Sequence, residues 1–334
     1  AAVQRLETRG IIEHGRLTPY GAEVEALPTD RPWAELLLHA DAELLPVVAV
    51  VSAVESLHRM TREERSLRGL LLAGSDHLTA YNVYAEAVNL HATVGEVYGL
   101  PRHVYGEGLA AWAEERGVLI KAIEDGALGM ASVYRALELP LPAALPLAGP
   151  SVLRRFQDLL VRIMPLDLVI DEQAADQTPV RVSRGSVCGS WGGMAGTIRY
   201  FADRSGTPRA AIEGTQLPLD LIRHAAHAGE AEVSYDPRHR HSALVAIRRL
   251  LYFGFELDRE QCEKTADCSS FGAAECIDKV CVAITNVGGS NEGGSNEGGS
   301  GGSPPIDPKW ECLGNVVPPD PGGDTVLHVC RFVL

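Results

Sequence analysis

Arginines in the middle of the chain, together with nearby aromatic residues, are of the types that bind nucleic acid. Between residues 181 and 249 there are 10 Arg against 6 Asp or Glu, although the whole chain has a formal net charge of −14. Guanidinium groups pair with phosphates, and aromatic rings stack on bases. An acidic average excludes a surface that is basic all over, so we expect a local phosphate-contacting patch. The candidate contacts are Arg181, Arg184, Arg199, Arg204 and Arg209, with Trp191 and Tyr200 as stacking surfaces.

A second interpretation of these residues stays open. Arginine is common throughout this lysine-poor chain, so the same pattern is also typical of a solvated surface. Trp191 and Tyr200 fit the core of a small barrel as well as they fit a binding surface.

Two other groups of residues have types that could do chemistry. The segment around Cys188 is similar to the nucleophile segment of cysteine proteases, but nothing in the spacing nominates a histidine partner. A glycine-rich turn with a packed Trp191 is therefore favoured. A zinc site would need further Cys, Asp or Glu at ligand spacing, so solvent-exposed histidines are favoured over a metal centre. The histidines concerned are His224, His227, His239 and His241.

Cysteine placement divides the chain near Glu260. Cys188 is the only cysteine among the first 261 residues, which suits a reducing cytosol. The spacing C-x5-C-x7-C-x4-C in the tail differs from paired zinc knuckles and favours disulfides. Residues 288–303 form a Gly/Ser/Asn/Glu tract that predicts a flexible linker. The tail cysteines are Cys262, Cys268, Cys276, Cys281, Cys312 and Cys330.

The first 30 residues predict a helix, a hairpin and a second helix. Val3 and Leu6 share one helical face, and the turn at His14 to Arg16 follows. Thr18 is then an N-cap, and Pro19 stands at the first helical position. This pattern has the size of a winged helix.

Residues 31–145 predict a helical bundle almost without interruption. Helices are expected after Pro32 and Pro46, at a capping-box spacing from Thr61, after a cap at Asp76, and over 118–137. Gly126 and Gly129 within the last of these helices indicate a close approach by another helix. The Pro-rich residues 139–150 then predict a linker or an extended crossing.

From residue 146 to 260 the pattern shifts toward strands. An amphipathic segment over 151–163 precedes strands at 179–184, 196–201, 209–213 and 231–235, with a helix over 217–228. Residues 244–255 fit a strand or a helix. The fold class is thus mainly α with a smaller β part, ending in a small barrel. The expected domains are 1–30, 31–145 and 146–260, followed by a Cys-rich segment 261–287, the disordered linker 288–303 and a tail 304–334.

Several of these segments resemble the C-terminal region of DEAH-box ATP-dependent RNA helicases. Gly15-Arg-Leu-Thr-Pro-Tyr-Gly21, followed by Leu27-Pro28, is similar to the winged helix of that family. Asp76-His-Leu-Thr79 with Asn82-Val-Tyr84 resembles its helical ratchet domain, and Trp112–Glu115 with 122–137 resembles the closing helices. Residues 151–258 fall where the family carries an OB-like domain.

The resemblance implies a nucleic-acid-gripping accessory region that starts mid-protein. The sequence contains no Gly-x-x-x-x-Gly-Lys-Ser/Thr, no Asp-Glu-Ala-His and no arginine-finger motif, so this chain is not expected to hydrolyse ATP unaided. ATP and Mg²⁺ are expected only in motor domains outside this chain, and whether the chain itself is an enzyme stays open. The expected partners are single-stranded RNA or DNA and the motor domains, with no membrane contact, in the cytoplasm.

The alternative function is a non-catalytic protein-interaction scaffold with an exported Cys-rich anchor. The tail resembles small Cys-rich modules of bacterial exported lipoproteins, and such a tail is inconsistent with a cytoplasmic body. A fusion or assembly artefact at the boundary is the competing explanation of the tail.

Overall fold

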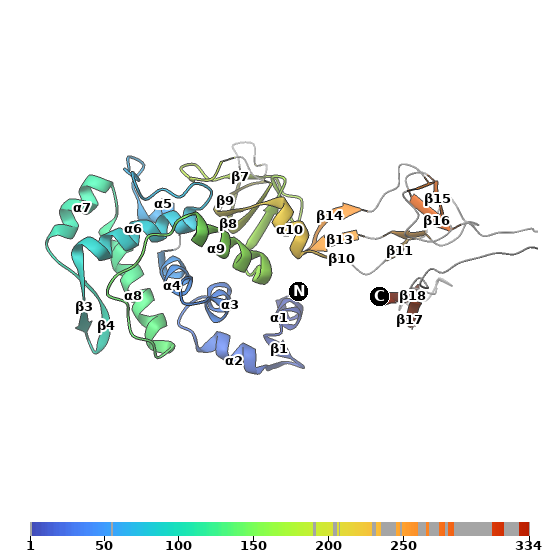
Figure 1. The fold of residues 1–334 in the computed structure, drawn as a ribbon, viewed down its shortest axis with the longest axis horizontal. Coiled ribbons are helices and arrows are strands. Elements are labelled where there is room, and N and C mark those ends of the chain that lie inside the picture. The colour runs from blue at the N-terminus through green and yellow to red at the C-terminus, as the bar shows by residue number, and fades with distance from the viewer. Residues whose placement is uncertain are drawn as a thin grey trace, which may run out of the picture. The chain divides into compact units, whose positions relative to one another are not determined.

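The computed structural model divides into two compact units, residues 1–225 and 226–334 (Figure 1). The division lies inside the predicted 146–260 domain, and the other predicted boundaries stay predictions. The residues that the structure describes are 2–54, 56–189, 192–202, 206, 208–228, 232–234, 245–247, 249–259, 265–266, 274–277, 280–283, 309–316 and 327–333.

The N-terminal segment folds as the sequence predicts. Helix α1 (Ala2–Thr8) leads to strands β1 (Ile12–Glu13) and β2 (Arg16–Leu17), which are joined by a two-residue turn. Both turn residues, His14 at φ 50° and Gly15 at φ 74°, are left-handed, as the tightest hairpin turns require. Thr18 then caps helix α2 (Pro19–Ala26), since its Oγ1 accepts a hydrogen bond from the Gly21 N–H at 2.9 Å.

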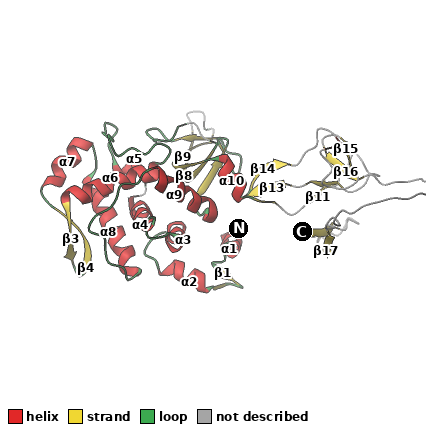
Figure 2. Ribbon diagram, viewed as in Figure 1, coloured by secondary structure: helices red, strands yellow, loops and turns green. Residues whose placement is uncertain are grey.

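Six helices follow in the described part of residues 31–136 (Figure 2). Most of the buried apolar residues of the bundle lie on them. They are α3 (Arg31–His39), α4 (Leu45–Val54), α5 (Leu57–Met60), α6 (Asp76–His91), α7 (Gly108–Arg116) and α8 (Ile120–Ala136). The predicted close approach at α8 is confirmed, because a Cβ on Gly129 would lie 2.2 Å from the Ala53 Cβ of α4. A Cβ on Gly126 would lie 3.0 Å from the Tyr84 ring.

Two predictions within the bundle are wrong. No helix starts at Thr61, because this residue ends α5 and its Oγ1 donates back to the Leu57 carbonyl at 2.9 Å. The helical pattern is also interrupted by a hairpin of β3 (Ala92–Val97) and β4 (Leu100–Tyr105), whose turn places Tyr98 and Gly99 at positive φ. A smaller correction concerns α6, which is capped by Ser75 and not by Asp76.

An extended strap, residues 138–149, crosses from α8 to α9 (Pro150–Ile163), as the prolines predict. Side chains of α6 hold its backbone. The Asn89 amide donates to the Leu145 carbonyl at 2.7 Å and accepts from the Leu145 N–H at 2.9 Å. The Tyr81 hydroxyl donates to the Pro146 carbonyl at 3.0 Å. The helical part and the following sheet are therefore joined by a fixed segment.

The sheet of the first unit has five strands in the order β6-β5-β8-β9-β7. All neighbours are antiparallel except β7 and β9. The sheet curls, so that its edge strands approach each other through a single bridge between Gln173 and Pro179. Three of the predicted strands are confirmed, and β5 and β6 were missed. The strands are β5 (Asp167–Ile170), β6 (Gln173–Ala174), β7 (Val180–Val182), β8 (Gly193–Ala202) and β9 (Pro208–Leu217).

One face of this sheet forms its own apolar core, centred on Val169, Val180, Met194 and Ile212. The sheet is followed by α10 (Leu219–Ala225), which confirms the predicted helix. The molecule is thus mixed α/β. Its identification as an OB-like barrel stays a prediction.

The second unit consists of short antiparallel pairings. The open choice at 244–255 resolves to strands at 245–247 and 249–252 and from 255 onward, and the predicted strand at 231–235 is confirmed over 232–234. Cys276 is disulfide-bonded, as the spacing predicts, while the tract 288–303 lies outside the described residues. No helix among the described residues is long and apolar enough to cross a membrane. The strands are β10 (His227–Ala228) with β13 (Arg249–Tyr252) and β14 (Phe255–Arg259), β11 (Glu232–Ser234) with β12 (Val245–Ile247), β15 (Ala274–Ile277) with β16 (Val280–Ala283), and β17 (Lys309–Val316) with β18 (Leu327–Val333).

Candidate nucleic-acid interface

Strand register places three of the predicted arginines on one face of the sheet. Arg199 on β8 and Arg181 on β7 both stand opposite Ala211 of β9, and Arg209 stands opposite Phe201. Residues paired across strands point to the same face, as do residues two apart along a strand. Arg181, Arg199, Phe201 and Arg209 therefore share one face, which we call the arginine face. All three arginines are exposed.

Phe201 supplies the aromatic ring of the arginine face. The ring is 39% exposed, and the guanidinium carbon of Arg181 lies 5.3 Å from its centroid. A cation at that distance is attracted by the ring. Sequence reasoning missed Phe201, although its spacing of two from Arg199 in a strand was the available signal. Tyr200, which was predicted instead, is 60% exposed but pairs with Ala210 of the apolar core and so lies on the opposite face.

The remaining predicted contacts are not brought into this face by the described structure. Arg184 is exposed in the turn after β7, and the neighbouring Gly185 carbonyl accepts a hydrogen bond from Arg65. Trp191 and Arg204 lie outside the described residues, so the packing of Trp191 in a glycine-rich turn stays a prediction.

The inner end of the same face is buried and polar, and it binds the start of α6. The Thr215 hydroxyl lies 2.7 Å from the Ser75 hydroxyl and 3.0 Å from His77 Nδ1. The His77 ring packs edge-on against Trp33 and Phe156, and burial lowers its pKa to about 4. His77 is therefore a neutral core residue that ties the helix to β9.

Asp76 fastens the loop after β7 to the same helix. Its carboxylate accepts hydrogen bonds from Ser186 Oγ at 2.7 Å, the Val187 N–H at 2.8 Å and the Gly214 N–H at 3.1 Å. Burial raises the pKa of Asp76, and these three donors act in the opposite direction. Asp76 and His77 are thus structural connections between α6 and the strands of the sheet with their loops.

Cys188 has the wrong environment for a nucleophile. Its Sγ lies 3.8 Å from an Asp76 oxygen, and burial together with that negative charge raises the pKa of the thiol to about 12. A thiolate is the reactive form, so this thiol is inert near neutral pH.

The predicted solvent-exposed histidines are only partly described. His224 is exposed on α10, and His227 begins β10. His239 and His241 lie outside the described residues. Within the part of the chain that the structure describes, no three His, Cys, Asp or Glu side chains come together as a metal site.

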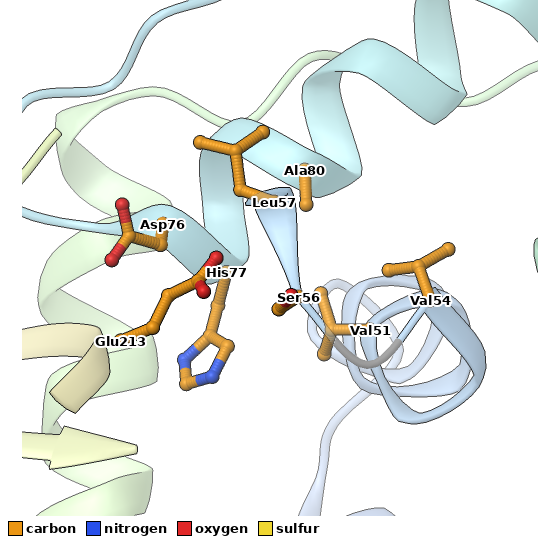
Figure 3. Close-up of a pocket in the computed structure, with 8 residues that line it drawn as sticks. All are labelled: Val51, Val54, Ser56, Leu57, Asp76, His77, Ala80 and Glu213. Atoms are coloured by element: carbon orange, nitrogen blue, oxygen red, sulfur yellow. The ribbon is translucent and has the colours of Figure 1, made fainter. Parts of the chain in front are cut away.

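A small cavity lies where α4, α5, α6 and β9 meet (Figure 3). It offers about 10 Å³, which is room for a water molecule and not for an organic substrate. On one side the Glu213 carboxylate accepts a hydrogen bond from the His58 N–H at 3.0 Å. On the other side the Ser56 hydroxyl accepts from the Arg59 N–H at 3.2 Å and from Arg199 Nη2 at 3.3 Å. The cavity is lined by Val51, Val54, Ser56, Leu57, Asp76, His77, Ala80 and Glu213.

Comparisons with known proteins add little to the evidence for a nucleic-acid interface. No family model matches the chain, and no curated protein matches it. Among solved structures, the chain is similar to the crystal structure of the E. coli DExH-box NTPase HrpB, with 14% identity and a TM-score of 0.42. The match covers 77% of this chain and 26% of that one, so the chain spans about a quarter of its length. A TM-score and an identity this low carry no argument about shared function.

Proposed function

We propose that the chain is a nucleic-acid-gripping accessory region of a DEAH-type ATP-dependent RNA helicase, and that it holds a single strand on the arginine face. The observation that carries this proposal is the arrangement of Arg181, Arg199 and Arg209 around the accessible Phe201 ring. The helicase assignment is supported by the sequence motifs at 15–21, 76–79 and 82–84.

The chemistry of the face suits an unpaired strand. Arginines neutralise phosphates whatever the sequence, and one aromatic ring stacks on any exposed base for about 1–3 kcal/mol. A duplex keeps its bases stacked on each other and would leave Phe201 without a partner. The expected ligand is thus single-stranded RNA or DNA, bound with little sequence preference.

The chain is expected to act without catalysis of its own. Its sequence lacks the phosphate-binding loop, the Mg²⁺ carboxylates and the arginine fingers of an ATPase. ATP and Mg²⁺ would act in motor domains, and the rigid connection of α6 to β9 would transmit their movement to the bound strand.

A second candidate function is a protein-interaction scaffold with an exported tail. The observation that favours it is the disulfide at Cys276, which suits an oxidising compartment. The scaffold predicts that the first unit has no affinity for nucleic acid.

Fluorescence anisotropy with a labelled single strand separates the two functions. The helicase proposal predicts binding whose affinity falls steeply as salt rises, because phosphate contacts release counterions. Absence of binding at low salt, or an affinity that salt does not change, would reject it and leave the scaffold. A duplex of the same sequence serves as the comparison ligand and should bind more weakly.

A further inference from the structure

One acidic side chain stands on the arginine face itself. Glu213 of β9 is opposite Thr197 and two residues from Ala211, which faces Arg199. Glu213 and Arg199 are therefore diagonal neighbours on one face, a separation that long side chains span. Unlike the exposed arginines, Glu213 is only 6% exposed.

Both side chains reach the same short segment. Arg199 Nη2 donates to the Ser56 hydroxyl at 3.3 Å, and a Glu213 oxygen accepts from the His58 N–H at 3.0 Å. Ser56 and Glu213 also line the same cavity (Figure 3). Within the described part of the chain, the Arg199 guanidinium donates to the neutral Ser56 hydroxyl. The Glu213 carboxylate is the acidic group beside it on this face, and the charge of Arg199 acts on it.

We propose that Glu213 is a built-in counter-anion for Arg199, which competes with a nucleic-acid phosphate for that guanidinium and so sets the affinity of the arginine face. This inference rests on the proposed function. Glu213 is a positioning residue in this role, because its buried carboxylate does not itself reach the bound strand. Phosphate that contacts Arg199 must draw the guanidinium away from this charge.

The surroundings of Glu213 make its charge adjustable. Burial raises the pKa of Glu213, and so does the nearby Asp76, while the His58 N–H, Arg199 and the His58 side chain lower it. The neutral His77 lines the same cavity. As pH falls through the raised pKa, Glu213 takes up a proton and the attraction on Arg199 is lost. Binding of phosphate should then strengthen.

The variant Glu213→Gln tests the inference. Glutamine keeps an oxygen acceptor for the His58 N–H but has no charge, and it removes the repulsion with Asp76. Binding of a fluorescein-labelled oligouridylate of about 12 nucleotides is measured by anisotropy over a salt series. We expect roughly fivefold tighter binding at low salt, the order that two opposite charges near a protein surface supply, and a salt slope steeper by up to about 0.7. Glu115→Gln, an equal change of charge at an exposed position of α7, is the control.

Each outcome is decisive. The inference is overturned if Glu213→Gln and Glu115→Gln bind the strand equally well, or if a folded Glu213→Gln binds it more weakly. Binding of the strand by the wild type would still support the proposed function. Absence of binding by the wild type would instead reject the proposed function. If Glu213→Gln does not fold, the pH profile of the wild type replaces it. Affinity must rise as pH falls from neutral through the raised pKa of Glu213, and this rise must be smaller in Arg199→Gln. An identical rise in both proteins would overturn the inference.

Discussion

The side chain of Asn82 forms with Ala148 the same pair of hydrogen bonds that a neighbouring β-strand would form. Asn82 Oδ1 accepts from the Ala148 N–H at 2.7 Å, and Nδ2 donates to the Ala148 carbonyl at 3.1 Å. Nδ2 also donates to the Leu70 carbonyl at 3.0 Å. One buried amide therefore joins the loop before α6, the helix itself and the strap that leads to α9.

Replacing Asn82 with alanine should destabilise the first unit by about 2–4 kcal/mol, because buried backbone groups at Leu70 and Ala148 would lose their partner. Urea unfolding followed by circular dichroism measures the change. Asn89→Ala is the matched control, since Asn89 makes the same pair of bonds with Leu145 but is exposed. Leu145 is itself buried, but the place of the exposed Asn89 side chain is open to solvent, so water can bond the two freed backbone groups and a loss of about 1 kcal/mol is expected. Equal losses for both variants would contradict the role of burial.

The contact of α8 with α4 gives a second prediction. Gly129→Ala would place a Cβ 2.2 Å from the Ala53 Cβ, so the helices must separate. The cost of overpacking, about 1–3 kcal/mol, should exceed the gain of about 1 kcal/mol from alanine's better helix propensity. The double variant Gly129→Ala with Ala53→Gly should recover part of the lost stability. A single variant as stable as the wild type would show that the helices do not meet at this point.

His77 gives the first unit a dependence on pH. Its pKa is lowered to about 4 from 6.5, so the unfolded chain takes up a proton in this interval and the folded chain does not. Stability should therefore fall as pH drops from 6.5 toward 4, by up to about 3 kcal/mol. The raised pKa values of Asp76 and Glu213 act in the opposite direction, so the wild type is compared with His77→Gln. The difference in unfolding free energy between the two proteins should change with pH in this window, and a constant difference would contradict a neutral buried His77.

The sequence predicted the structure correctly where it depends on residues a few positions apart along the chain. The hairpin at His14, the cap at Thr18 and the extended strap follow from turn residues, caps and prolines within a few positions. It failed at Thr61, where the hydroxyl bonds back to Leu57 and not forward, a choice that the capping pattern alone does not reveal. The β3–β4 hairpin was missed because its residues were assigned to the surrounding helical pattern.

The candidate site was also predicted only in part from the sequence. The arginines were predicted from composition, but their gathering on one face depends on the pairing of β7 and β8 with β9, which are far apart in sequence. Phe201 and Tyr200 are adjacent and both aromatic, and only the strand register separates the ring beside Arg181 from the ring on the opposite face. Glu213 was not selected, because its importance arises from contacts with α5 across the fold.

The central claim is that the arginine face grips a single strand, and the most direct test removes its charge. A triple variant, Arg181→Gln with Arg199→Gln and Arg209→Gln, is compared with a triple variant of the exposed Arg16, Arg135 and Arg154, which changes the net charge equally. In anisotropy titrations with a labelled single strand, the first variant should bind at least about tenfold more weakly than the wild type, with a salt slope smaller by about 2. The second should stay within about threefold of the wild type. Equal weakening by the two variants, or an unchanged affinity of the first, would contradict a grip by the arginine face.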